Sequence, residues 1–184
     1  MGTSTRHIAL LRGINVGGKN RLPMADLKAM FARAGCEAAS TYVQSGNVVF
    51  EADAALASRI PATIQGEIES RCGLSVPVLI RTAEELSRAA ANNPFLAEGD
   101  DPADLHLVFL ADTPSADAAG SLDPERSPPD RFALHGREVY LKCPNGLGRS
   151  KLTTGYFDSK LRTVSTIRNW RTVQALLAMS ESSC

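Results

Sequence analysis

Tyr42-Val-Gln-Ser-Gly-Asn-Val-Val-Phe50 is the stretch that decides the fold of this 184-residue chain. Two β-rich runs flank Gly46-Asn47, and a pair that begins with glycine favours a two-residue β-hairpin turn. An apolar run, His7–Leu11, precedes the hairpin and predicts a buried strand. A second run, Val76–Ile80, follows it and predicts an edge strand, because it contains Pro77.

Helical patterns separate these strands. Pro23 suits the first position of a helix, and apolar residues recur at helical spacing from Met24 until Gly35. Every fourth residue from Leu56 to Cys72 is apolar, which predicts a long amphipathic helix. The order β-α-β-β-α-β is that of a ferredoxin-like half-domain.

The same order returns later in the chain. His106–Leu110 is similar to the first apolar run, and Phe132–Tyr140 is similar to the hairpin, with Gly136 in place of Gly46. A helix over residues 150–161 and a short extended piece after it complete the second copy.

We therefore predict an α+β fold in which two ferredoxin-like βαββαβ halves form one compact body. Residues 1–92 form the half with the glycine-rich cationic loop, and residues 93–184 form the half with the C-terminal helix. The second copy has nine fewer residues between its first strand and its hairpin, and we expect the loop Arg12–Arg21 to account for the difference.

This loop, Arg12-Gly-Ile-Asn-Val-Gly-Gly-Lys-Asn-Arg21, has the composition of an anion site. Its glycines let backbone N–H groups turn inward, and its three cations supply positive charge, which suits a phosphate. In a βαββαβ unit the loop after the first strand and the central hairpin emerge at the same end of the sheet, so polar hairpin residues should flank the loop. The ligand-binding residues expected in this half are Arg12, Asn15, Gly17, Gly18, Lys19, Asn20, Arg21, Gln44, Ser45 and Asn47.

A second cationic loop, Asn145–Lys151, lies in the other half. We expect Ser150 to cap a helix with Lys151 in its first turn, and Thr166 to cap a helix that carries Arg168 and Arg171. Cations at a helix N-terminus oppose the helix dipole, and either solvent screening or a bound anion relieves that conflict. Lys151 and Arg168 therefore join the candidate ligand-binding residues.

Three classes of function stay open. The first is a binding protein for a phosphorylated ligand, either a nucleotide or a nucleic acid. The second is a nucleotide-dependent phosphotransferase, because Gly13–Asn20 differs from the P-loop pattern only in Asn20, which lacks the hydroxyl that binds Mg²⁺. Lys19 would then hold a β-phosphate, and Asp112 or a water would replace the hydroxyl. The third is a protein-interaction scaffold with no small ligand, in which the loop only connects two elements.

Composition and charge indicate the class of protein and its expected location. A chain with 43% hydrophobic and 22% charged residues and no apolar run near ~20 residues is soluble and globular, and we expect it in the cytoplasm. The net charge is zero, but residues 1–50 carry +4, residues 51–131 carry −9 and residues 132–184 carry +5. Both glycine-rich loops therefore lie in basic portions, which would attract an anionic partner.

The cysteines and the tryptophan indicate structural roles. Cys36, Cys72, Cys143 and Cys184 lack the spacing of a metal site, so we expect free thiols and no metal. Trp170 lies on an apolar helical stripe and is expected in the core, and 5% aromatic residues are few for a protein that stacks single-stranded bases. The sequence identifies no cofactor and leaves the oligomeric state open.

Several separate motifs resemble a known family. Ala9–Asn20, Tyr42–Phe50, Asn93-Pro-Phe95 and Thr166–Trp170 are similar, in this order, to motifs of the bacterial family called domain of unknown function 1697. The resemblance runs from about Arg6 to Met179. It implies a cytoplasmic α+β protein with ferredoxin-like halves and brings no established activity, substrate or catalytic residue.

Overall fold

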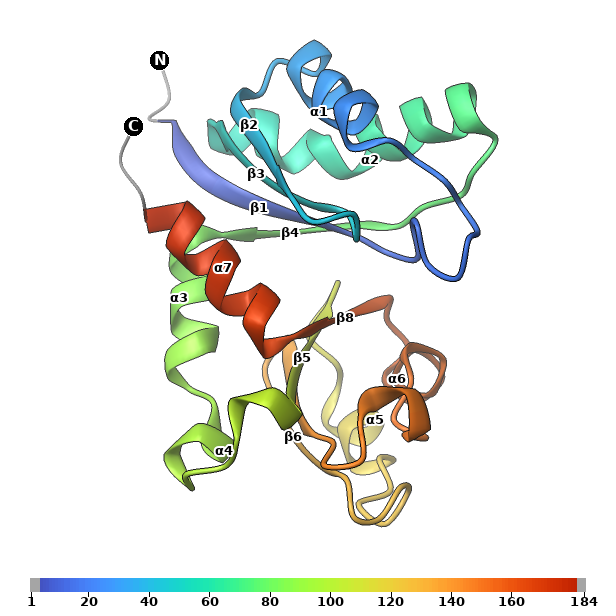
Figure 1. Cartoon of the computed structure of the whole chain (residues 1–184), viewed down its shortest axis with the longest axis vertical. Coiled ribbons are helices and arrows are strands. Elements are labelled where there is room, and N and C mark those ends of the chain that lie inside the picture. The colour runs from blue at the N-terminus through green and yellow to red at the C-terminus, as the bar shows by residue number, and fades with distance from the viewer. Residues whose placement is uncertain (1–3, 182–184) are drawn as a thin grey trace. The chain divides into compact units, whose positions relative to one another are not determined.

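The computed structural model describes residues 4–181, which form two compact units with one four-stranded sheet each (Figure 1). The first unit contains residues 4–87 and 175–181, and the second contains Arg88–Gln174. The sequence placed this division between residues 92 and 93 and assigned the whole C-terminal helix to the second half. In the structure the chain changes unit inside a helix on both occasions.

The first unit has the order β-α-β-β-α-β. Its strands are arranged β2-β3-β1-β4, and every neighbouring pair is antiparallel, which is the ferredoxin-like arrangement. Its elements are β1 (Thr5–Leu11), α1 (Met24–Arg33), β2 (Glu37–Tyr42), β3 (Asn47–Ala52), α2 (Ala54–Cys72) and β4 (Val78–Thr82).

The second unit repeats this order. Its strands are arranged β6-β7-β5-β8, again with antiparallel pairs, so the predicted α+β fold with two ferredoxin-like halves is confirmed. The β5–α5 loop, residues 111–115, is shorter than the β1–α1 loop, residues 12–23, as expected. The remaining elements are α3 (Ala83–Ala91), α4 (Pro94–Ala97), β5 (Leu105–Leu110), α5 (Ala116–Gly120), β6 (Arg131–His135), β7 (Glu138–Lys142), α6 (Thr154–Leu161), β8 (Ser165–Asn169) and α7 (Trp170–Glu181), with short 3-10 helices at Pro102–Asp104 and Leu147–Arg149.

Local sequence signals define the ends of α2. The Asp53 carboxylate accepts a hydrogen bond from the backbone N–H of Leu56 (2.8 Å), and Gly73 ends the helix at φ 65°. Pro61 lies inside the helix. One face of α2 is fully buried and packs in the core of the first unit, through Ile60, Ile64 and Ile68.

Both faces of the first sheet are buried along β1. Ala9 and Leu11 pack with α1 and α2 in the same hydrophobic core, while Ile8 and Leu10 lie on the opposite face with no exposed surface. A strand buried on both faces reads as a continuous apolar run, which explains why it could be recognised from sequence.

The first hairpin turn differs from its prediction. Tyr42 and Asn47 are paired, so the turn has the four residues Val43–Gly46 and is not the two-residue Gly46-Asn47 turn. Two constraints require glycine at position 46: a positive φ and the absence of space for a side chain. A Cβ added there would lie 2.7 Å from the Cβ of Leu11 and 2.9 Å from the Cδ1 of Ile14.

Two helix starts in the second unit were also predicted wrongly. Thr153, and not Ser150, caps α6 by accepting a hydrogen bond from Tyr156 N (3.2 Å), so Lys151 precedes the helix. The residues from Ser165 to Asn169 pair with β5 as a strand, and α7 begins only after Asn169. The helix does not begin at Thr166 because the backbone N–H and C=O groups of this segment form their hydrogen bonds with β5, a strand distant in the sequence.

The contacts of Gly46 predict that a methyl group there is costly. Gly46→Ala should lower the free energy of unfolding in urea by about 2 kcal/mol or more, because it adds backbone strain at φ 75° and a steric clash. Gly66→Ala is the matched control, since Gly66 lies in α2 with nothing within 4 Å of an added Cβ, and it should stabilise by ~0.5–1 kcal/mol. Equal effects of the two substitutions would contradict this account.

Candidate functional site

The loop Arg12–Arg21 folds into a small hairpin of its own. Val16 and Lys19 form an antiparallel bridge, and the backbone N–H of Lys19 donates to the Val16 carbonyl (3.1 Å). Gly17 and Gly18 occupy the tip at φ 59° and 76°, the pair of positive angles that a type I′ turn requires. Nothing lies within 4 Å of a Cβ added to either, so backbone angle and not close packing selects glycine here.

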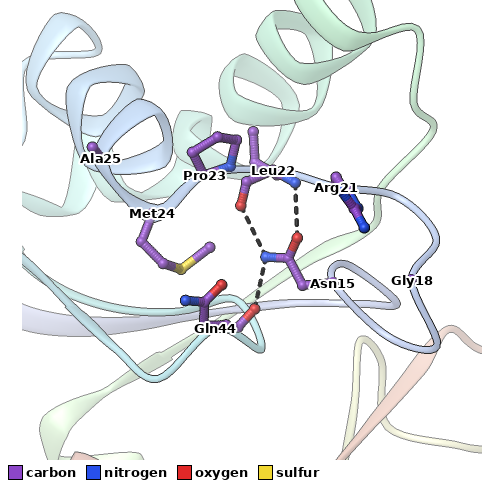
Figure 2. A pocket seen from close by; sticks show the side chains of 8 residues that line it. All are labelled: Asn15, Gly18, Arg21, Leu22, Pro23, Met24, Ala25 and Gln44. Carbon is purple, nitrogen blue, oxygen red and sulfur yellow. Dashed lines mark hydrogen bonds between the residues drawn. The ribbon is translucent and has the colours of Figure 1, made fainter.

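The side-chain amide of Asn15 ties this hairpin to two other segments. Its Nδ2 donates to the carbonyls of Leu22 and Gln44, both at 2.8 Å, and its Oδ1 accepts from Leu22 N at 2.9 Å (Figure 2). The prediction that the loop and the β2–β3 turn lie side by side is therefore confirmed. Because both amide hydrogens are used, Asn15 positions the loop and has no donor left for a ligand.

Two further asparagines have the same kind of role. Asn20 Nδ2 donates to the Gly13 carbonyl (2.9 Å). Asn47 is fully buried, and its Nδ2 donates to the Tyr42 carbonyl (3.1 Å) and to Ser45 Oγ (3.0 Å). Both side chains, which were expected to contact a ligand, stabilise the loop or the turn; Asn47 is buried, whereas Asn20 is exposed and keeps its second amide hydrogen.

A pocket of about 590 Å³ lies between the loop, the start of α1 and the β2–β3 turn (Figure 2). The expected site residues that line it are Asn15, Gly18, Arg21 and Gln44. The lining residues that the sequence did not identify are Leu22, Pro23, Met24 and Ala25. Pro23 could have indicated them, because it predicts a helix start, and the first N–H groups of a helix need an acceptor from outside the helix.

The start of α1 supplies backbone donors at this pocket. Pro23 is the N-cap and its side chain accepts no hydrogen bond, so the N–H groups of the first turn have neither an intrahelical acceptor nor a side-chain cap. Met24 and Ala25 belong both to this turn and to the pocket lining. The positive end of the helix dipole therefore points at the pocket, and Asp26, an exposed residue of the same turn, offsets part of it.

The polar side chains that remain available are Lys19, Arg21 and Gln44. All three are exposed. Within residues 4–181, neither cation forms an ion pair, whereas Arg6 pairs with Glu51 at 3.0 Å. The Gln44 side-chain amide likewise has no hydrogen-bond partner in that part of the chain.

The candidate residues of the second unit have different surroundings. Lys151 is exposed, and its backbone N–H donates to Ser127 Oγ (3.0 Å). Arg168 is buried on β8, where its Nη1 donates to Thr166 Oγ1 (2.8 Å) and to the Ile167 carbonyl (2.9 Å). Burial lowers the pKa of Arg168 to about 10, so it stays charged at neutral pH. The prediction that Arg168 and Arg171 lie on the same helix is wrong, because Arg168 belongs to β8 and Arg171 to α7.

The P-loop comparison fails on geometry. Lys19 lies on the second arm of the small hairpin, and α1 begins only at Met24, whereas a P-loop helix begins at the Gly-Lys pair. Asp112 belongs to the second unit, where its backbone N–H donates to Thr163 Oγ1 (3.0 Å). Over the described range 4–181, no group of three or more His, Cys, Asp or Glu side chains is placed to hold a metal ion. In the same range no helix is long and apolar enough to cross a membrane.

Comparisons with known proteins give a family and a similar fold. The family model described as protein of unknown function (DUF1697) matches residues 4–140. The solved structure of a conserved bacterial protein from Streptococcus pneumoniae is similar over 97% of this chain and 100% of that chain, with a TM-score of 0.73 and 20% sequence identity. At this identity the likeness shows the fold alone. No curated protein matches the chain.

The three hydrogen bonds of Asn15 predict a large effect of one isosteric change. Asn15→Asp removes both donated bonds and sets a carboxylate against two carbonyl oxygens, so the free energy of unfolding in urea at pH 7 should fall by about 2 kcal/mol. Asn20→Asp, which removes one such bond in the same loop, should cost about 1 kcal/mol. A loss at Asn15 no larger than that at Asn20 would refute the assigned role.

Burial predicts which thiols react. Cys36, Cys72 and Cys143 are free; burial raises the pKa of Cys36 and of Cys143 to about 11, while Cys72 is exposed. Alkylation by iodoacetamide at pH 8.5, followed by peptide mass spectrometry, should modify Cys72 and spare the other two until urea is added. Because the folded protein favours the neutral form of Cys36 and Cys143, their contribution to the free energy of unfolding is fully present below pH 9.0. That contribution is lost as the pH rises toward 11. Equal labelling of all three in the folded protein would be the opposite result.

Proposed function

The chain belongs to DUF1697, a family of proteins of unknown function, and we propose that it binds a phosphorylated ligand through the loop Arg12–Arg21 and the pocket at the start of α1. The observation that carries the proposal is the position of Arg21. This cation lines the pocket beside the uncapped first turn of α1 and forms no ion pair within residues 4–181. A guanidinium and backbone N–H groups around one concave space suit a phosphate.

The remaining cations of the loop support the same proposal. Lys19 is exposed on the small hairpin, and Arg12 follows β1 with its backbone N–H bonded to the Pro77 carbonyl (2.9 Å). Three cations within ten residues raise the local positive potential even though the chain as a whole is neutral. An anionic ligand would therefore be drawn toward the pocket.

The loop Arg12–Arg21 is held in one conformation by contacts within the protein. The loop is closed by its internal bridge and held by the amides of Asn15 and Asn20. A loop that is already ordered loses little conformational entropy when a ligand binds, so more of the contact energy contributes to affinity.

Binding is favoured over phosphoryl transfer by the loop residues themselves. The amide of Asn20, the residue in place of the P-loop hydroxyl, is used to hold the Gly13 carbonyl. Lys19 lies away from the helix start and does not line the pocket. A pure protein-interaction scaffold would bind no small ligand at Arg21, and its stability would show no response to added anions.

We expect phosphate-bearing compounds to raise the melting temperature. Phosphate, pyrophosphate and nucleoside 5′-monophosphates would be compared by thermal shift at low and high salt, and stabilisation should follow RT ln(1 + [L]/Kd) and weaken with salt. Arg21→Ala should raise Kd about tenfold or more, since a hydrogen bond to a charged group contributes ~1.5–3 kcal/mol.

Arg59→Ala is the matched control, because Arg59 is an exposed arginine of α2 in the same unit. It should leave every shift unchanged. The proposal fails if no phosphate-bearing probe gives a shift, or if Arg21→Ala and Lys19→Ala both retain the wild-type shifts.

A further inference from the structure

The pocket at the start of α1 is lined by both polar and apolar residues. Arg21 and Gln44 present polar side chains, and Asn15 holds the backbone carbonyls of Gln44 and Leu22. The apolar lining residues are Leu22, Pro23, Met24 and Ala25. Inorganic phosphate would use only Arg21 and the N–H groups at the start of α1, so Gln44 and the apolar lining residues fit an additional, uncharged part of the ligand.

Met24 is the most adaptable of the apolar lining residues. It is half-buried and packs against the core of the first unit on one side, while it lines the pocket on the other. In Figure 2 its thioether side chain extends toward Gln44. A methionine sulfur makes favourable contacts with aromatic rings and adapts to ring shape.

Gln44 offers hydrogen bonds that the fold does not use. Its backbone carbonyl is held by Asn15, which fixes its position, but its side-chain amide has no partner within residues 4–181. A carboxamide presents a donor and an acceptor side by side, the pattern that pairs with the edge of a nucleobase.

Two exposed apolar residues are next to pocket residues in the sequence. Val16 and Val43 are the two most exposed large hydrophobic residues of the described chain, at 63% and 52%, and they adjoin Asn15 and Gln44 in sequence. Val43 has φ 48°, an outlier for a β-branched residue, so the turn holds it at a cost. Backbone strain of this kind concentrates at ligand sites.

The size and charge of the pocket favour a small molecule over a polymer. A volume of about 590 Å³ lies within the ~300–1,000 Å³ typical of small-ligand sites. No aromatic side chain lines the pocket to stack successive bases, and Arg21 is the single charged residue that lines it. These features suit one base and one phosphate group or a short phosphate chain.

We propose that the ligand is a nucleoside phosphate whose base lies between Met24 and Gln44 and whose phosphate lies at Arg21 and the start of α1. This inference rests on the proposed function, because it assigns the ligand class of the same pocket. Met24 and Gln44 determine base recognition, while Arg21 holds the phosphate.

The test compares ligands that differ only in the base. Isothermal titration calorimetry would measure the 5′-monophosphates of adenosine, guanosine, cytidine and uridine against ribose 5-phosphate. At least one nucleotide should bind about tenfold more tightly than ribose 5-phosphate. Gln44→Ala and Met24→Gln should remove that difference and leave the ribose 5-phosphate affinity unchanged, whereas Met24→Leu should retain most of it.

Two controls separate the possible failures. Gln65→Ala, on α2, should change nothing, and Arg21→Ala should weaken nucleotide and ribose 5-phosphate by the same factor. If all nucleotides and ribose 5-phosphate bind equally to the unmodified protein, the base site is refuted while phosphate binding stands. If only single-stranded oligonucleotides bind, and Met24→Gln and Gln44→Ala have no effect, the ligand is a nucleic acid and this inference is wrong. If no phosphorylated probe binds, both proposals fail.

Discussion

The hydrogen bonds of the Asn15 side chain are the interaction on which the candidate site depends. One amide joins the loop after β1, the residue before α1 and the turn between β2 and β3. These segments come from separate parts of the first unit, and each would otherwise leave a backbone carbonyl or N–H to be satisfied by water. An amide is the one neutral side-chain group that supplies two donors and an acceptor in a plane, which explains why this position has asparagine. Its φ of 53° is also one that asparagine tolerates better than most residues.

The two halves show how one topology supports different surfaces. Both have the same strand order, but only the first has the long glycine-rich loop between its first strand and first helix. In the second half the corresponding loop is short, and Asp112 within it is bonded to Thr163. The fold shared with the Streptococcus pneumoniae protein therefore says little about function, which depends on what each loop carries.

The functional roles within the loop are divided between amides and cations. Asn15, Asn20 and Asn47 hold the backbone: Asn15 and Asn47 each donate two hydrogen bonds within the protein, and Asn20 donates one. The groups left for a ligand are Arg21, Lys19, the Gln44 amide and the N–H groups at the start of α1. A sequence pattern cannot separate these two roles, because it records which polar groups are present and not which of them are already hydrogen-bonded.

The sequence by itself determined the class of the fold and the place of the candidate site. Apolar periodicity is a local signal, and the structure has β1, α1 and α2 where it predicts them. The predicted caps Ser150 and Thr166 and the two-residue turn at Gly46-Asn47 are not formed, because the chain around them forms different hydrogen bonds. The proximity of the loop and the hairpin also followed from topology alone. Only the tertiary structure decided that Ser165–Asn169 is a strand, that Arg168 is buried in it, and that the start of α1 forms a wall of the pocket. The physical reason is that these outcomes depend on partners distant in the chain: β5 for the strand, and the loop and turn for the pocket. Local propensity does not specify such partners.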